Sequence, residues 1–183
     1  MSKVKQLIES YGKHIAVPWR KDAAAAQRVI FCVYRENEEL RLRAKIDEFE
    51  IVTKEAGHQW VVFDLTDTFS NWLAAQRYAQ SYFQSPHLLP TLLPKYLDFI
   101  ADTFSTFLLD RNVGENSVVV LKGVGSVFGF LKVKDLVNRL APIVQGKLLV
   151  LFPGSYENNN YRLLDGYDGW NYLAVPITAD KIL

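Results

Sequence analysis

The sequence predicts an α/β fold of the Rossmann- or flavodoxin-like kind, a three-layer sandwich with helices on both faces of a mostly parallel sheet. Short apolar runs typical of buried strands recur along the chain, and segments with helical periodicity lie between them. Glycine, proline and asparagine mark the boundaries. We expect about five strands joined by right-handed crossovers. We also expect one domain over residues 1–183, because no repeat, long linker or second composition divides the chain.

Composition fits a globular protein with one hydrophobic core. The 183 residues are 49% hydrophobic and 22% charged, and a net charge of +1 gives no general attraction to nucleic-acid phosphate. Cys32 is the only cysteine, which excludes a disulfide within the chain and fits a reducing compartment. No apolar stretch approaches the roughly 20 residues that cross a bilayer, and the N-terminus lacks a secretion signal. We therefore expect a cytoplasmic protein without a membrane segment.

The first third of the chain predicts two helices and two strands. Apolar residues at helical spacing indicate a helix over 4–11, whereas residues 14–27 have no regular pattern. Residues 28–34 form an apolar run that predicts the first buried strand. A helix over 37–56 begins with an asparagine and two glutamates, which stabilise a helix N-terminus. Residues 59–65 predict the second strand.

The rest of the chain continues this alternation. Helices over 66–76 and 94–108 are separated by a segment with three prolines in which the helical signal weakens. Strand 117–121, helix 133–140, strand 147–152 and strand 173–177 follow in that order. We expect Pro153 and Gly154 to end the fourth strand.

A flavodoxin-like strand order, 2-1-3-4-5, would place a ligand-binding crevice between the first and third strands. Arg35, Glu36, the loop at 123–129 and the turn at 153–157 would then meet at the carboxyl edge of the sheet. A fold that separates the first strand from the third would remove this crevice.

The glycine-rich loop lies after a strand and before a helix, where a phosphate-binding loop would lie. Its glycines, Gly123, Gly125 and Gly129, depart from the G-x-G-x-x-G spacing, and no Lys-Ser/Thr pair follows them. We favour tight turning and close packing of helix on sheet. Phosphate or nucleotide binding through these glycines and Ser126 is the alternative, and we expect no cofactor.

Metal binding is not expected. The three histidines, His14, His58 and His87, are far apart in sequence, and none is followed by a ligand-type residue at position i+3 or i+4. Asp165 and Asp168 could hold a cation with Glu157, but aspartates around a glycine more often fold a loop through bonds to the backbone.

No residue shows the sequence context of a catalytic group. Cys32 lies inside an apolar strand, where a thiol behaves as a small hydrophobe. Ser126 lacks the G-x-S-x-G context of a nucleophile elbow. Asp64 ends the second strand, where acids occur in α/β enzymes, but a turn or helix-capping role is favoured. We therefore expect a protein that is not an enzyme.

The loop after the fourth strand combines amides with large side chains. Tyrosine, tryptophan and arginine are favoured anchors of protein interfaces, so this loop is either self-packed or a partner-binding surface. We weigh the two interpretations evenly. The candidate partner-binding residues are Tyr156, Glu157, Asn159, Asn160, Tyr161, Arg162, Asp168 and Trp170. The basic residues between the glycine-rich loop and the fourth strand are sparse and interleaved with acids, so direct contact with nucleic acid is not expected; they are Lys132, Lys134, Arg139 and Lys147.

Several segments resemble the BrxB family, small proteins of bacterial BREX phage-exclusion systems. They are GVGSVFGF (123–130), LLVLFPG (148–154), YENNNYRLLD (156–165) and DGWNYLAVPI (168–177), with RAKIDEFE (43–50), GHQW (57–60) and DLTD (64–67) upstream. The likeness covers most of the chain. Residues 166–167 differ from the pair expected before Asp-Gly-Trp.

The resemblance implies phage defence inside a bacterium or archaeon. The family works among larger components: the AAA+ ATPase BrxC, the phosphatase-like protein PglZ and a DNA methyltransferase. It provides no catalytic residues to carry over. The resemblance therefore implies a non-catalytic adaptor or scaffold between PglZ and the BrxC-type ATPase. The alternatives are a nucleotide- or phosphate-binding sensor or enzyme, and a DNA-contacting subunit. The oligomeric state is left open.

Overall fold

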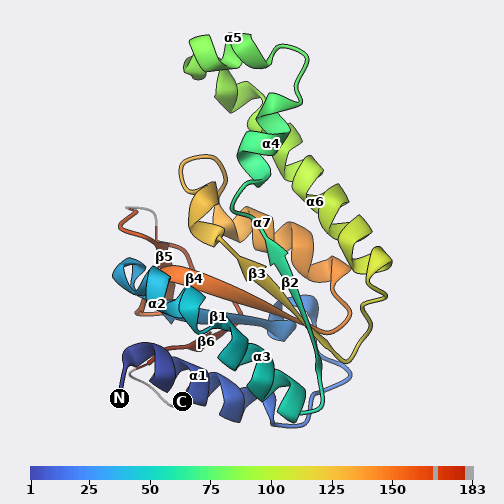
Figure 1. The fold of residues 1–183 in the computed structure, drawn as a ribbon, viewed down its shortest axis with the longest axis vertical. Helices are drawn as coiled ribbons and strands as arrows, with labels where there is room; N and C mark the ends of the chain where they lie inside the picture. Colours follow the sequence, from blue (N-terminus) through green and yellow to red (C-terminus); the bar gives the residue numbers. More distant parts are fainter. Residues whose placement is uncertain (167–168, 180–183) are drawn as a thin grey trace.

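The computed structural model describes residues 1–166 and 169–179. It is an α/β sandwich with a mostly parallel sheet, which confirms the predicted fold class (Figure 1). The strands are β1 (Val29–Tyr34), β2 (Gln59–Asp64), β3 (Ser117–Lys122), β4 (Lys147–Glu157), β5 (Asn160–Leu163) and β6 (Val175–Ile177). The α-helices are α1 (Lys3–Ile15), α2 (Glu39–Ala44), α3 (Ile46–Glu55), α4 (Thr68–Ala74), α5 (Ala79–Gln84), α6 (Leu93–Asp110) and α7 (Val133–Leu140). Short 3-10 helices include η1 (Ala25–Arg28), η2 (Glu36–Glu38), η3 (Pro86–Thr91), η4 (Val124–Val127) and η5 (Ala141–Ile143).

The strand order is β2-β3-β4-β1-β6, so the expected order, which placed β1 beside β3, is wrong. β4 lies between them and pairs in parallel with both. The physical reason is burial. Every residue of β1 is buried, as is almost the whole apolar part of β4, and these two strands take the centre of the sheet. β2 has exposed residues at both ends and lies at an edge.

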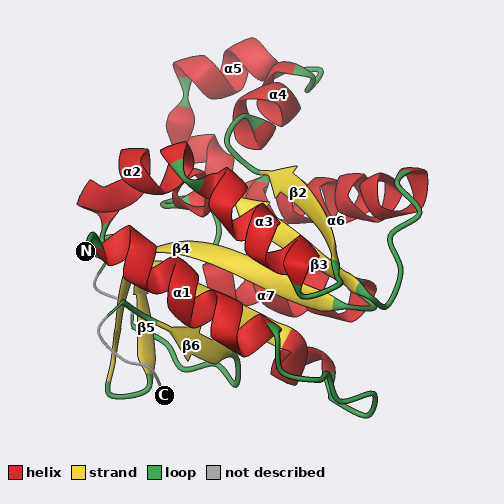
Figure 2. Cartoon of the chain, turned by 60° about the horizontal axis from the view of Figure 1, so that its bottom comes forward, coloured by secondary structure: helices red, strands yellow, loops and turns green. Residues whose placement is uncertain are grey.

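Helices cover both faces of the sheet (Figure 2). Alternate residues of β1 point to opposite faces: Ile30 and Cys32 pack with α1 and α3, and Phe31 and Val33 pack in the core that includes α6 and α7. The helix predicted over 37–56 is broken at Lys45 into α2 and α3, which follow η2. Of the described helices, none is long and apolar enough to cross a membrane.

A helical arm projects beyond the sheet (Figure 1). It consists of α4, α5, η3 and the first part of α6, and we call residues 68–94 the arm. Its inner side is held by aromatic packing, in which Trp72 and Tyr96 lie with ring centroids 5.1 Å apart. Its outer side exposes Tyr78 and Phe83, each 60% accessible to solvent.

Candidate functional site: the carboxyl edge and the β4–β5 hairpin

β4 does not end at Pro153 and Gly154, as the sequence led us to expect, but continues to Glu157 and folds back as β5. The strand continues because Pro153 still pairs with β1 and its carbonyl accepts a hydrogen bond from the Leu164 amide at 2.8 Å. Gly154 is required by close approach: a Cβ there would collide with the carbonyl of Arg162 on β5.

The hairpin turn is formed by Asn158 and Asn159, whose φ angles are 51° and 64°. Glu157 and Asn160 are paired across it, which leaves a two-residue loop with positive φ at both positions. Such turns match the natural twist of two strands, and asparagine tolerates positive φ better than most residues. Asn158 and Asn159 therefore have a structural role, which is to form the turn. An Asn-Asn pair between two Tyr-containing segments is a sequence signal for a hairpin, and the sequence-based prediction did not use it.

An aromatic cluster supports the hairpin from beneath. Tyr161 is fully buried, and its ring centroid lies 4.5 Å from that of Phe31, 4.6 Å from Tyr156 and 5.3 Å from Trp170. Burial raises the pKa of the Tyr161 hydroxyl. The backbones of Tyr161 and Trp170 also exchange two hydrogen bonds, which tie the segment after β5 to the hairpin. The members of the aromatic cluster are Phe31, Phe152, Tyr156, Tyr161, Trp170 and Tyr172.

The predicted partner-binding residues thus separate into two groups. Tyr161 points into the core, so it supports the surface instead of forming it, and Tyr156 and Trp170 are half-buried. The exposed members are Glu157, Asn159, Asn160 and Arg162. The Tyr156 hydroxyl donates a hydrogen bond to the Asn159 side-chain oxygen at 3.1 Å, which fixes the turn against the cluster. Asp168 lies outside the described residues.

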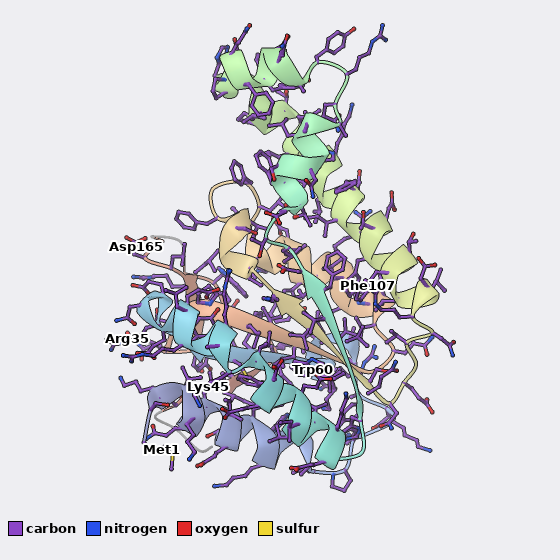
Figure 3. All side chains as sticks on the ribbon, viewed as in Figure 1. Met1, Arg35, Lys45, Trp60, Phe107 and Asp165 are labelled. Carbon is purple, nitrogen blue, oxygen red and sulfur yellow. The ribbon has the colours of Figure 1, made fainter. Side chains whose placement is uncertain are left out.

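A hollow of about 690 Å³ opens beside the hairpin, and we call it the carboxyl-edge crevice. It lies where β1 and β4 end, because the chain leaves these two neighbouring strands toward opposite faces of the sheet. The hairpin residues from Gly154 to Asn159 form one wall. Lys3, Arg35 and Pro176 line other parts of it, from three distant segments of the chain. Figure 3 shows Arg35 on the same side of the molecule as Asp165, just past the end of β5.

Charge in the crevice is balanced. Lys3 and Arg35 supply positive charge, and Glu38 and Glu157 supply negative charge. The Glu38 side chain is 15% exposed and pairs with Arg41 through one oxygen at 3.0 Å. Its other carboxylate oxygen is buried and has no hydrogen-bond partner among the described residues. A buried carboxylate oxygen without a partner is unfavourable, because it has lost its contacts with water and gained no hydrogen bond in return.

The glycine-rich loop also lies at the carboxyl edge, but several of its polar groups already form hydrogen bonds within the protein. The Ser126 hydroxyl donates to the Leu65 carbonyl at 3.0 Å and the Gly123 carbonyl at 2.6 Å. The amides of Ser126 and Phe128 also donate to carbonyls within the loop. Gly123, with φ of 74°, has no room for a Cβ against Thr66. These contacts are those of a tightly packed turn, and phosphate binding here stays a prediction that nucleotide titration tests.

The remaining candidate residues are in environments typical of structural residues. Asp64 accepts hydrogen bonds from the amide and hydroxyl of Thr66, which is the turn role favoured from sequence. Cys32 is completely buried, and burial raises the pKa of its thiol. His14 and His58 lie at the other end of the sheet from the crevice. Within the described ranges, no three His, Cys, Asp or Glu side chains are placed to hold a metal ion.

Comparison with curated proteins and with solved structures finds no match. The family model described as BREX protein BrxB matches residues 63–176. This region begins in β2 and ends in β6, so it includes the arm, the glycine-rich loop, all of β4 and the hairpin. It covers more than half of the 183 residues and confirms the resemblance. The chain therefore belongs to the BrxB family and is a component of a BREX phage-defence system.

Proposed function

We propose that this BrxB-family chain is a non-catalytic adaptor that joins PglZ to the BrxC-type ATPase. The observation that carries the proposal is the β4–β5 hairpin beside the carboxyl-edge crevice. The hairpin presents exposed polar side chains on a backbone fixed by the aromatic cluster. A surface held in one conformation before binding loses little conformational entropy on binding, which favours recognition of a partner.

The crevice suits a short segment of a partner protein. Its volume of about 690 Å³ lies in the range of sites that enclose small ligands or a few side chains. Its balanced charge and its amides, Asn158 and Asn159, match a polar peptide better than a phosphate or a nucleic acid. The carboxylates of Glu38 and Glu157, which line the crevice, offer acceptors for a backbone or side-chain N–H of that segment.

An adaptor must hold two partners at once, and the arm is a separate surface. Of its residues, Arg77 is the only one with a formal charge when histidine is neutral. Tyr78, Phe83 and Leu88 are exposed on it. We assign this arm to the second partner. The matching surface on that partner would be an uncharged apolar groove, because charged groups buried against the arm would have no ion-pair partners. In Figure 1 the arm is at the top and the hairpin is on the left.

Co-purification of the full chain with PglZ and with the BrxC-type ATPase tests the proposal. The double reversal Glu157→Arg/Arg162→Glu changes two exposed side chains of the hairpin and should abolish capture of one partner. Tyr78→Ser/Phe83→Ser should abolish capture of the other. Glu55→Arg, an equally exposed reversal at the end of α3, should leave both intact. Failure of the unaltered chain to bind either component would refute the adaptor.

A further inference from the structure

A second hollow, of about 720 Å³, opens at the opposite edge of the sheet, where the strands begin. It lies between the segment after α1, the start of β1, and the connection from η5 to β4. Four cationic side chains line it, Arg20, Lys21, Arg28 and Lys147, against a single lining carboxylate, that of Glu115. Arg20 is paired with Asp22 at 3.4 Å, so its charge is already balanced. We call it the amino-edge pocket.

Arg28 and Lys147 are held side by side by the sheet. Val29 of β1 is in register with Leu148 of β4, so the residues just before them are neighbours across the parallel pair. Both side chains are half-buried, and neither forms an ion pair with a described carboxylate. Two adjacent cations without a counter-ion repel each other, and partial burial weakens the screening by water.

The two cations differ in how they are satisfied. One Arg28 amino group donates to the carbonyls of Val144, Gln145 and Gly146, but its buried Nε has no hydrogen-bond partner among the described residues. Lys147 Nζ lies 5.2 Å from the centre of the Trp19 ring, and this cation–π contact is weaker than an ion pair with a carboxylate would be. Burial, and then the nearby Arg28 charge, lower the pKa of Lys147. An anion between them would stabilise both charges.

The pocket wall is also fixed. Trp19 stacks on His58 with ring centroids 3.8 Å apart and planes at 16°. His58 in turn bonds to the side chain of Asn116, which donates to the Gly57 carbonyl at 2.8 Å. An aromatic ring, an amide and paired cations in one recess are the groups that recognise phosphate attached to an organic body.

We propose that the amino-edge pocket binds a small phosphate-bearing anion, an oligophosphate or a nucleotide, through Arg28 and Lys147. The cations line a recess, which fits a small molecule better than the extended backbone of a duplex. The site is distinct from the glycine-rich loop, which lies at the other end of the strands.

Isothermal titration calorimetry of the full chain with tripolyphosphate and with ATP, at constant ionic strength, tests the site. We expect saturable binding that Lys147→Gln weakens by about tenfold or more, the loss typical of one charged hydrogen bond. Lys134→Gln, which removes an exposed lysine from α7, and Ser126→Ala, in the glycine-rich loop, should each change the affinity by less than about twofold. Thermal melting of each variant checks that it is folded.

Two positive results define the ligand. Equal affinity for tripolyphosphate and ATP identifies recognition of the phosphates alone. Tighter binding of ATP that is lost in Trp19→Ala identifies a nucleotide. The proposal is overturned by an absence of saturable binding at millimolar ligand or by unchanged affinity in folded Lys147→Gln. It is also overturned if Ser126→Ala abolishes binding, or if duplex DNA displaces tripolyphosphate at lower concentration than ATP does.

Discussion

Removing the Tyr161 ring should cost a large part of the folding free energy although no partner can touch it. Tyr161 is fully buried, and four aromatic rings of the cluster lie with centroids 4.5 to 5.9 Å from its own. Truncating a buried aromatic ring to alanine typically costs about 3–5 kcal/mol, through lost burial and the cavity that remains. A domain of this kind is stable by about 5–15 kcal/mol, so Tyr161→Ala removes roughly a third to a half of a mid-range value.

Tyr161→Phe is the matched control. The hydroxyl reaches its acceptor, the Ala174 carbonyl, only at 3.5 Å, the long limit for a hydrogen bond. Its removal should therefore cost no more than about 1 kcal/mol. Urea unfolding followed by far-UV circular dichroism gives both values, and equal slopes for the two variants would show that the same surface unfolds. If Tyr161→Ala lies within about 1 kcal/mol of the unaltered chain, or Tyr161→Phe is as unstable as Tyr161→Ala, the packing argument is wrong.

The same pair of variants connects stability to binding. Tyr161→Ala should reduce capture of the hairpin partner even under conditions where the chain remains folded, because the strands lose their support. Tyr161→Phe should preserve capture. Loss of capture in both variants would instead indicate that the hydroxyl itself takes part.

Three further predictions concern the hairpin, the face of α1 and pH. Gly154→Ala should lower the free energy of unfolding by about 1–3 kcal/mol, since its Cβ would collide with the facing strand. Thr53→Val should cost about 1–3 kcal/mol because it leaves the buried Tyr11 hydroxyl, now 2.7 Å from Thr53 Oγ1, without its partner, and adding Tyr11→Phe should recover most of that loss. Burial, and then Lys147, lower the pKa of His14 below its ordinary 6.5, so the unfolded chain binds the proton more readily. The contribution of neutral His14 to the free energy of unfolding is therefore complete above pH 6.5 and decreases as the pH falls below that value. In chemical denaturation, His14→Leu should reduce the loss of stability between about pH 7 and pH 5.

Each of these has a control. Gly114→Ala, with open space around the new methyl group, should change stability by less than about 0.5 kcal/mol. A double variant of Tyr11 and Thr53 that is as unstable as Thr53→Val alone would contradict the hydrogen-bond explanation. For pH, the comparison is between His14→Leu and the unaltered chain. An identical slope in His14→Leu and the unaltered chain would remove His14 as its cause.

Local pattern was sufficient for the fold class and insufficient for the strand order. The apolar runs at β1 and β4 indicate buried strands, but burial does not say which buried strand is the neighbour of which. β4 lies between β1 and β3, so among the described strands the crevice expected between those two is absent, and the hollow beside the hairpin lies instead where the neighbouring strands β4 and β1 end. Lys3 and Pro176 line that crevice from opposite ends of the chain, and no short sequence window could bring them together.

The residues of the β4–β5 hairpin stand out in the sequence, but the direction in which each side chain points was not predicted. Counting two residues per repeat from the asparagine turn would have placed Tyr161 and Leu163 on one face and Arg162 on the other, which is what β5 shows. This alternation was not predicted because Pro153 and Gly154 were expected to end the strand. Proline removes one donor only, and here its carbonyl still takes part in the structure.

The two backbone edges nearest the crevice are already blocked. Trp170 occupies the outer side of β5 through its bonds to Tyr161. β6 is only three residues long, and Pro176 in its centre has no amide hydrogen. Among the residues that the structure describes, these two edges therefore leave no unpaired backbone on which another polypeptide could add a strand. If the proposed partner binds at this end of the molecule, side chains rather than an added strand would have to provide the selectivity, and a single side-chain substitution in either protein would then change the specificity of binding.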